Sequence, residues 1–308
     1  MKKSKAPKEV VGGRWSVVRK AKTENRSPKT KDQSRKNDEQ RFRKQDKKTN
    51  LPLSTQHSAL GTQCSAMIFG VLPVLEALRA KNRRIEKILI ADGAQEKRLF
   101  DVLDLARQNG VRFEKIPRAN LSKFVEEGAN HQGIVAFVAS ADYTDAGELF
   151  DEITNRENSL TVILDGVEDP RNLGAILRTV ECAGADGVFI PERRAVGLTE
   201  TVAKSSAGAT EYVKVAKVAN INRLIDNLKE NNVWVVGTSA EAETDYSDWD
   251  WTRASALVLG GEGSGLHRLT AEKCDVLVKI PLLGKIESLN VSVACGVILF
   301  EAVRQRKK

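Results

Sequence analysis

The sequence predicts an α/β protein with two folded domains behind a basic N-terminal extension. Apolar runs of strand length alternate with amphipathic runs of helix length from residue 67 onward, a pattern typical of α/β folds. The 308 residues suffice for two domains, and a hydrophobic content of 41% suffices to build their cores. The charge distribution supplies the third observation, because it separates the extension from the rest.

The positive charge of the chain is concentrated at its N-terminus. Residues 1–50 hold 18 Lys and Arg against 6 Asp and Glu, whereas residues 51–308 hold 31 against 35. A segment so polar cannot bury enough apolar surface to offset its ordering entropy, so we expect residues 1–66 to be disordered. Its charge favours RNA as a partner, through release of counterions. The alternative is a tail that only aids solubility.

Residues 67–140 form the first predicted domain. Its expected elements, in chain order, are AMIFG (strand), VLPVLEALRAK (helix), RIEKILIA (strand), KRLFDVLDLARQNG (helix), VRFEKIP (strand), RANLSKFVEE (helix) and QGIVAFVA (strand). Gly110 is expected to end the second helix, and Asn120 to cap the third. This alternation indicates a small, separate α/β unit.

Residues 141–157 are polar and predict a linker that contains a short helix, and residues 158–308 form the second domain. It opens with LTVILDGV, an apolar, β-branched strand of the kind found in parallel sheets. The remaining elements, in chain order, are NLGAILRTVECAG (helix), GVFI (strand), LTETVAKSSAG (helix), VKVAKV (strand), INRLIDNLKEN (helix), VWVVGTSA, ALVLGG and VLVKIP (strands) and LNVSVACGVILFEAVRQRKK (helix).

The cysteines and the apolar runs indicate a cytoplasmic protein. No CxxC pair occurs, so the sequence predicts neither a zinc site nor a disulfide framework. Cys182 and Cys295 lie in apolar helical runs and are interpreted as small core residues. No apolar stretch has the length of a membrane span, and the N-terminus has neither a signal-peptide core nor the acid-poor composition of a transit peptide.

The first segment whose residues could bind a ligand or take part in catalysis is DGVEDPRNLGAILRT, residues 165–179, where a strand passes through a polar turn into a helix. Asn172 lies near the start of that helix, a position that favours anionic groups. Arg178 follows six residues later and is expected to project from nearly the same side. The alternative is that Asn172 is only a helix cap and Arg178 only a surface charge.

The second segment is LVLGGEGSGL, residues 257–266, in which four glycines follow a strand. Glycines permit tight turns and a close approach of the backbone to a ligand. Neither the dinucleotide fingerprint nor the P-loop pattern is present. Glu262 is unusual in such a turn, because a loop that holds phosphate avoids a carboxylate.

The third segment is IPLLGKIESLNVSVACGVILFEA, residues 280–302. Ser288 and Asn290 precede its apolar helix, and the simpler interpretation makes Ser288 the N-cap. All three segments place polar residues after predicted strands, which is the edge where open α/β sheets bind ligands.

In order and spacing, the three segments closely resemble the signature motifs of the SpoU-type family of RNA methyltransferases, within the SPOUT superfamily. This resemblance covers residues 158–308. FGVLPVLEAL and HQGIVA in residues 67–140 are similar to the L30e-like RNA substrate-binding domain of many members. The bacterial 23S rRNA guanosine-2′-O-methyltransferase subgroup is the most similar one.

The resemblance implies a C-terminal domain with a deep trefoil knot, an exception to the rule that chains are unknotted. It also implies S-adenosyl-L-methionine as the cofactor, held mainly by backbone groups. The corresponding cofactor-binding positions are Thr238, Ser239, Gly260, Gly261, Ile280 and Leu289. An apolar slot for adenine is expected from Leu259, Ile280, Leu282 and Leu289.

The implied reaction is attack of a ribose 2′-hydroxyl on the cofactor's methyl group. Arg178 is the implied contact or base for that hydroxyl, but arginine is a poor base, so we assign it positioning and charge stabilisation. Asn172, Glu262, Ser288 and Asn290 are expected to orient Arg178 and the ribose. No metal is expected, and His131 is interpreted as a turn residue or RNA contact. Family members are homodimers that share their active sites.

Three alternatives remain at this point. The substrate is tRNA instead of 23S rRNA, or the chain is a catalytically silent RNA-binding protein of ribosome assembly, or it is a nicotinamide-dependent oxidoreductase. The presence of all five polar residues, Asn172, Arg178, Glu262, Ser288 and Asn290, argues against a catalytically silent protein. The absence of a G-x-G-x-x-G motif after an early strand argues against an oxidoreductase.

Overall fold

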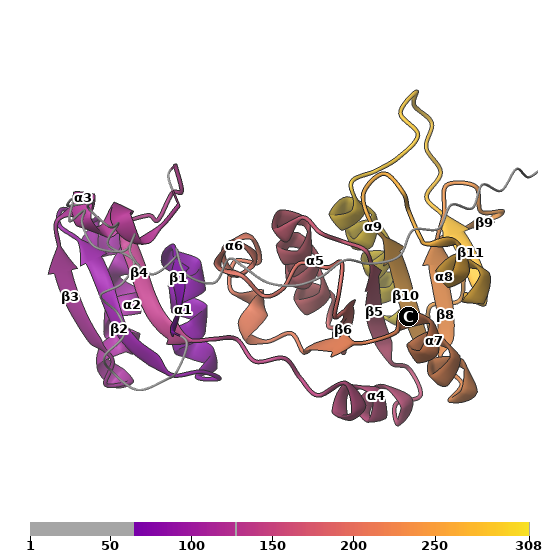
Figure 1. The fold of residues 1–308 in the computed structure, drawn as a ribbon, viewed down its shortest axis with the longest axis horizontal. Coiled ribbons are helices and arrows are strands. Elements are labelled where there is room, and N and C mark those ends of the chain that lie inside the picture. The colour runs from indigo at the N-terminus through magenta and orange to yellow at the C-terminus, as the bar shows by residue number, and fades with distance from the viewer. Residues whose placement is uncertain (1–64, 127, 308) are drawn as a thin grey trace, which may run out of the picture. The chain divides into compact units, whose positions relative to one another are not determined.

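The computed structural model describes residues 65–126 and 128–307 (Figure 1). The predicted disordered extension lies outside these residues, except for Ser65 and Ala66, which begin the first strand. Two separate sheets are present, one of four strands and one of seven. No helix among these residues is long and apolar enough to cross a membrane.

The first sheet lies within residues 65–139 and has the strand order β1-β4-β2-β3. Its strands are β1 (Ser65–Phe69), β2 (Ile85–Ala91), β3 (Arg112–Ile116) and β4 (Ile134–Ala139). β4 is antiparallel to both of its neighbours, and β2 and β3 are parallel. Helices α1 (Val71–Ala80) and α2 (Glu96–Gln108) pack their apolar sides on one face, around Val74, Leu78 and Leu99.

The third helix of this part differs from its prediction. The chain forms only one turn, α3 (Arg118–Leu121), followed by the 3₁₀ turn Ser122–Phe124. Pro117 occupies the N-cap position, and no side chain caps the helix, so the assignment of Asn120 as the cap was wrong. Asn120 lies inside the turn, and its backbone N–H donates to the Pro117 carbonyl.

The second sheet contains seven strands, all parallel, in the order β7-β6-β5-β10-β8-β11-β9. Its strands are β5 (Leu160–Asp165), β6 (Gly187–Pro191), β7 (Val215–Val218), β8 (Trp234–Thr238), β9 (Thr244–Asp245), β10 (Ser255–Gly260) and β11 (Val276–Lys279). β5 and β10 are buried at every position, as expected for central parallel strands covered on both faces.

Helices cover both faces of this sheet. Its helices are α4 (Ala146–Thr154), α5 (Pro170–Ala183), α6 (Glu200–Ser205), α7 (Ile221–Glu230), α8 (Arg268–Lys273) and α9 (Val291–Arg306). One core joins α5 and α9 to alternate strand residues such as Val162 and Leu257. The other joins α4 and α7 to the residues between them, such as Ile163 and Val258. The period of two residues in a strand therefore divides its apolar side chains between two cores.

Local caps fix where these helices begin. The side chains of Asp145, Asp169, Thr199 and Asn220 accept a backbone N–H in the first turns of α4, α5, α6 and α7. Cys295 is buried in α9 as predicted, whereas Cys182 is exposed on α5, so its assignment to the core was wrong. The run around Cys182 is amphipathic, and Cys182 falls on its polar side.

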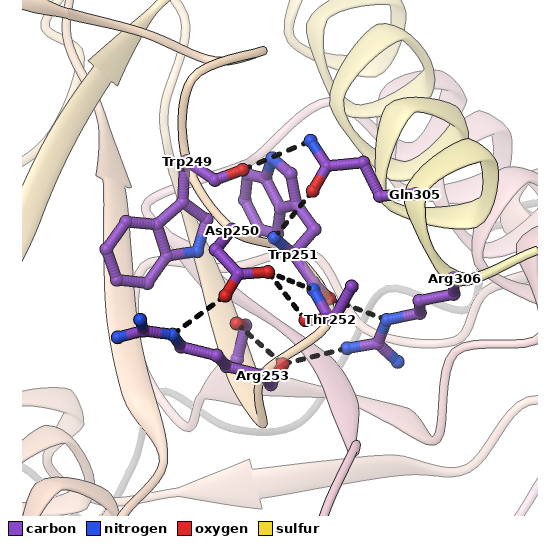
Figure 2. A network of polar contacts seen from close by, with 8 residues as sticks. Trp249, Asp250, Trp251, Thr252, Arg253, Gln305 and Arg306 are labelled. Atoms are coloured by element: carbon purple, nitrogen blue, oxygen red, sulfur yellow. Dashed lines mark hydrogen bonds and ion pairs between the residues drawn. The ribbon is translucent and has the colours of Figure 1, made fainter. Parts of the chain in front are cut away.

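The C-terminal end of α9 is hydrogen-bonded to the amino-terminal edge of the sheet (Figure 2). The Arg306 guanidinium donates to four backbone carbonyls at 2.6–3.0 Å, those of Asn158, Ser159, Trp251 and Arg253. These carbonyls lie just before β5 and β10. Gln305 accepts from the backbone N–H of Trp251 and donates to the carbonyls of Ser247 and Trp249. Two adjacent residues of α9 thus hold the backbone segments that precede β5 and β10.

We expect Arg306→Ala to lower the free energy of unfolding by about 2–4 kcal/mol, because several half-buried carbonyls lose a charged donor together. Arg304→Ala is the matched control. Arg304 is exposed and pairs with Glu301 one turn away on the same helix, so its loss should leave the unfolding free energy essentially unchanged. Urea denaturation of both variants measures the difference, and equal effects would contradict the assignment.

His131 is a buried turn residue before β4. Its Nδ1 accepts the backbone N–H of Gly133 at 3.0 Å, which leaves Nε2–H to donate to Ser122 Oγ at 3.1 Å. Burial lowers the pKa of His131, and the positive charges of Arg118 and Lys204 lower it further. The imidazole is therefore held neutral, as its two hydrogen bonds require.

This lowered pKa makes part of the stability pH-dependent. The unfolded chain, with an ordinary histidine pKa of about 6.5, takes up a proton that the folded chain does not. The contribution of His131 is present above that pH and is lost as the pH falls below it. Accordingly, the difference in unfolding free energy between the wild type and His131→Gln should shrink from pH 7.5 to pH 5.5 in denaturant titrations. A difference that does not vary with pH would refute this account.

Candidate active site

The three polar segments meet at one edge of the seven-stranded sheet. Asp165 ends β5, Gly260 ends β10, and the two residues are register partners on adjacent parallel strands. Thr238 ends β8, which pairs with β10 on its other side. The segments therefore emerge together at the carboxyl edge of the sheet, as the sequence predicts.

The glycine segment after β10 forms a loop too tight for side chains. A Cβ on Gly260 would lie 2.0 Å from the carbonyl carbon of Gly265, and a Cβ on Gly261 would lie 2.3 Å from the Gly166 carbonyl oxygen. Gly263 and Gly265 have φ values of +84° and +64°, which L-residues rarely adopt. Each of the four glycines is thus required by close backbone contact or by its conformation.

A cavity of about 740 Å³ opens beside this loop. Its wall comes from the ends of β8, β10 and β11, from the loop before α9, and from α9 itself. All six residues predicted to bind a cofactor line it, namely Thr238, Ser239, Gly260, Gly261, Ile280 and Leu289. Leu259 and Leu282, predicted for the apolar slot, line it as well. Residues from separate segments, distant in sequence, therefore form one concave surface.

Charged residues at the cavity are mainly acidic. The carboxylate-bearing residues Glu241, Glu262 and Glu287 line it, whereas Lys279 is the cationic residue among its lining residues. A cavity of this charge favours a ligand with positive charge on its polar part.

A chain of hydrogen bonds joins the three segments. Asn172 Nδ2 donates to a carboxylate oxygen of Glu262, and Asn290 Nδ2 donates to Asn172 Oδ1 at 3.0 Å. Asn290 Oδ1 in turn accepts the backbone N–H of Ser292 at 2.9 Å and thereby caps α9. Because an ionised carboxylate only accepts, Glu262 fixes the amide orientation of Asn172, which then fixes that of Asn290. This explains the unusual Glu262: its partner is an amide.

The caps differ from the simpler interpretations of the sequence. Asp169, not Asn172, caps α5, and Asn172 is 9% exposed at the start of that helix. Asn290, not Ser288, caps α9. Ser288 is an exposed residue of the preceding loop and lines the cavity. Asn172, Glu262, Ser288 and Asn290 are thus brought together, although Ser288 is not one of the residues in the hydrogen-bond chain.

Arg178 does not join this group, so the prediction that it projects from the same side as Asn172 was wrong. Six residues at 3.6 per turn leave two side chains about 120° apart around a helix. The structure agrees, because Asn172 is buried and Arg178 is exposed. Within a single chain, the four polar residues do not orient Arg178.

Asp165 and His267 lie at the same edge, although no role was predicted for either. The Asp165 carboxylate is nearly buried, with 9% of its side chain exposed, and contacts His267. A carboxylate at the end of an otherwise apolar strand is a signal that sequence reasoning can use, because such a charge requires a partner. Its partner is 102 positions away along the chain, and nothing local in the sequence identifies it.

Comparisons with known proteins agree with this architecture. Residues 159–300 match the profile of the SpoU rRNA Methylase family. Residues 67–144 match one described as RNA 2′-O ribose methyltransferase substrate binding. A putative TrmH family tRNA/rRNA methyltransferase, YacO of Bacillus subtilis (strain 168), is 42% identical over 240 residues, which cover 78% of this chain and 95% of YacO.

The chain belongs to the SpoU/TrmH family of RNA methyltransferases. Two solved structures are also similar to it. The SpoU methyltransferase AviRb from Streptomyces viridochromogenes, in complex with the cofactor AdoMet, has a TM-score of 0.64 and 28% identity, over 79% of this chain and 91% of that one. An RNA 2′-O ribose methyltransferase has a TM-score of 0.68 and 26% identity, over 80% and 90%. The SpoU-type assignment and the α/β fold are thereby confirmed.

The glycine loop of this SpoU-family protein permits a direct test. Gly261→Ala places a methyl group against a backbone oxygen that cannot move without shifting β5, so we expect a loss of about 1–3 kcal/mol of unfolding free energy. Gly296→Ala is the control: Gly296 lies inside α9, and a Cβ there would meet only Thr179 Cγ2 of α5, at 3.8 Å. There alanine should stabilise by about 0.5–1 kcal/mol. Effects of the same sign in urea denaturation would contradict the packing argument.

Proposed function

We propose that this chain is an S-adenosyl-L-methionine-dependent RNA 2′-O-ribose methyltransferase that acts on a guanosine of 23S rRNA. One observation carries the proposal. The cavity at the carboxyl edge is bordered by a hydrogen-bond chain that links Asn172, Glu262 and Asn290, one residue from each motif. A ligand-sized pocket therefore lies next to a preorganised set of polar groups.

The cavity fits S-adenosyl-L-methionine. A volume of about 740 Å³ is typical of pockets that enclose small ligands. Four apolar residues, Leu259, Ile280, Leu282 and Leu289, supply a slot for adenine, and the glycine loop offers backbone groups without side-chain obstruction.

The acidic residues of the wall suit the positive sulfonium and ammonium groups of this cofactor, and Lys279 suits its carboxylate. When bound, S-adenosyl-L-methionine supplies an electrophilic methyl group. We assign its binding to the six predicted cofactor residues, all of which line the cavity.

The chain's own residues then position the ribose. The Asn172 and Asn290 amides are fixed by their mutual hydrogen bond and by Glu262, so their orientation needs no reorganisation when RNA binds. Ser288, at the rim, offers a hydroxyl that both donates and accepts. We assign these four residues to holding the 2′-hydroxyl in place for attack.

Arg178 is assigned to the reacting ribose of a partner protomer. Its guanidinium is exposed on α5, which packs against α9. α9 and the loop before it expose several large apolar side chains, namely Leu283, Ile286, Val293 and Phe300. An exposed apolar surface of this extent is typical of an interface. We propose a homodimer through this surface, in which Arg178 of one protomer completes the other's site by holding the RNA phosphate and offsetting negative charge on the hydroxyl oxygen.

The substrate assignment rests on the N-terminal part. We propose that residues 67–140 form the L30e-like RNA-binding domain, residues 141–157 a linker whose helix α4 packs in the core of the seven-stranded sheet, and residues 158–308 the catalytic domain. The match of residues 67–144 to a substrate-binding profile supports this division. The tRNA alternative stays open, since the related Bacillus protein is described as a tRNA/rRNA methyltransferase. The trefoil knot and the cytoplasmic location stay predictions.

Genetic complementation tests the function and the substrate together. Deleting the gene should remove 2′-O-methylation at one guanosine of 23S rRNA. Mapping the 2′-O-methyl positions in total RNA measures this loss. Wild type should restore the mark and Arg178→Ala should not, because the positioning charge is lost. Arg223→Ala, which removes an exposed arginine from α7 on the other face of the sheet, should restore it. Loss of a tRNA mark would select the alternative, and full activity of Arg178→Ala would overturn the role of Arg178.

A further inference from the structure

A second pair of polar residues lies at the carboxyl edge, outside the hydrogen-bond chain of the active site. His267, which precedes α8, donates its backbone N–H to Asp165 Oδ2 at 3.0 Å. Its ring Nδ1 lies 2.9 Å from Asp165 Oδ1. Both carboxylate oxygens of Asp165 are therefore engaged by one residue, which fixes the position and the plane of the imidazole.

These contacts determine which ring nitrogen is available to a ligand. An ionised carboxylate only accepts hydrogen bonds, so the proton lies on Nδ1. Within the described part of the chain no group hydrogen-bonds to Nε2, and 56% of the His267 side chain is exposed. The geometry is that of a histidine oriented by a carboxylate with its other nitrogen directed to a binding partner.

The pair is packed closely against the cofactor loop. Gly166 follows Asp165 with φ +86°, and a Cβ there would lie 3.3 Å from Cε1 of His267. The carbonyl of Gly166 in turn lies against Gly261, and the N–H of Gly261 donates to the Asp165 carbonyl at 3.0 Å. The imidazole thus lies just outside the cavity, separated from it by a layer of glycine backbone.

The pair can present a donor to an anion. His267 is the titratable group that contacts the nearly buried Asp165 carboxylate in the described structure. When an anion binds at Nε2, a proton taken up there makes Nε2–H a donor toward it, and the carboxylate on the other side of the ring offsets the added positive charge. The neighbouring cation, Arg268, is already paired with Glu272 in the next turn of α8.

From this geometry we propose that His267 is an RNA-backbone contact: its Nε2–H donates to a phosphodiester oxygen of the strand that carries the target ribose. Asp165 is its positioning residue. The inference rests on the proposed methyltransferase function, because the cofactor fills the cavity and the RNA strand must then run along the edge outside it. Backbone contacts of this kind set the register of a nucleic acid on a protein.

The test uses the full chain and a 23S rRNA transcript. His267→Asn keeps the side-chain hydrogen bond to Asp165, since the asparagine Nδ2 can donate as Nδ1 of His267 does, but it removes Nε2. We expect RNA affinity to fall about ten-fold, the size of a lost charge-assisted hydrogen bond. The slope of log affinity against log salt should drop by roughly one phosphate contact. The substitution should raise the KM for RNA more than it lowers kcat.

Two further variants separate an RNA contact from a structural role. His267→Arg should restore RNA affinity and the salt slope, because it again supplies a charged donor. Arg223→Leu removes one positive charge on the other side of the sheet and should leave both unchanged. If the Asp165–His267 contact has only a structural role, His267→Asn should bind RNA as the wild type does, and that result would overturn the proposal.

The outcome also separates this inference from the function it rests on. If the wild type methylates the transcript and His267→Asn binds RNA with unchanged affinity and salt slope, only the role of His267 falls. If the wild type neither binds nor methylates any RNA, the methyltransferase proposal falls and this inference falls with it.

Discussion

The amide of Asn172 bridges two parts of the chain that are far apart in sequence. It donates to Glu262, 90 residues away, and accepts from Asn290, 118 residues away. Asn290 also caps α9, so the start of the C-terminal helix, the glycine loop and the start of α5 share one set of hydrogen bonds. Because each partner fixes the orientation of the next, the loss of any one leaves the others with unsatisfied groups near the cavity. The shape of the cavity depends on this bridge.

The parallel sheet brings those groups to the same place. All seven strands run in one direction, so every segment that follows a strand emerges at one edge. α9 spans the sheet from that edge to the opposite one. Asn290 anchors its first turn at the site, and Gln305 and Arg306 anchor its last turn at the amino-terminal edge (Figure 2). A helix held at both ends keeps its cavity-lining residues in position without relying on the exposed loop before it.

The distribution of apolar and charged groups fits the proposed chemistry. Half of the large apolar side chains that are exposed in the described structure lie on α9 and on its preceding loop, beside the cavity. Arg178 is likewise directed away from its own polar network. The proposed homodimer would cover the apolar surface and bring an arginine to each site. Asp165 holds His267 at the same edge, where we propose its contact with the RNA backbone.

The sequence by itself determined the alternation of strands and helices and the edge of the sheet that carries the site. These follow from local patterns, since apolar periodicity and glycine spacing are read within a few residues. The residues that line the cavity were predicted from the resemblance of the three motifs to the SpoU-type family. Only the tertiary structure decided that Glu262 pairs with Asn172 and that Asp165 and His267 form a pair. Hydrogen bonds between residues about one hundred positions apart depend on how the strands are ordered, which no local pattern encodes.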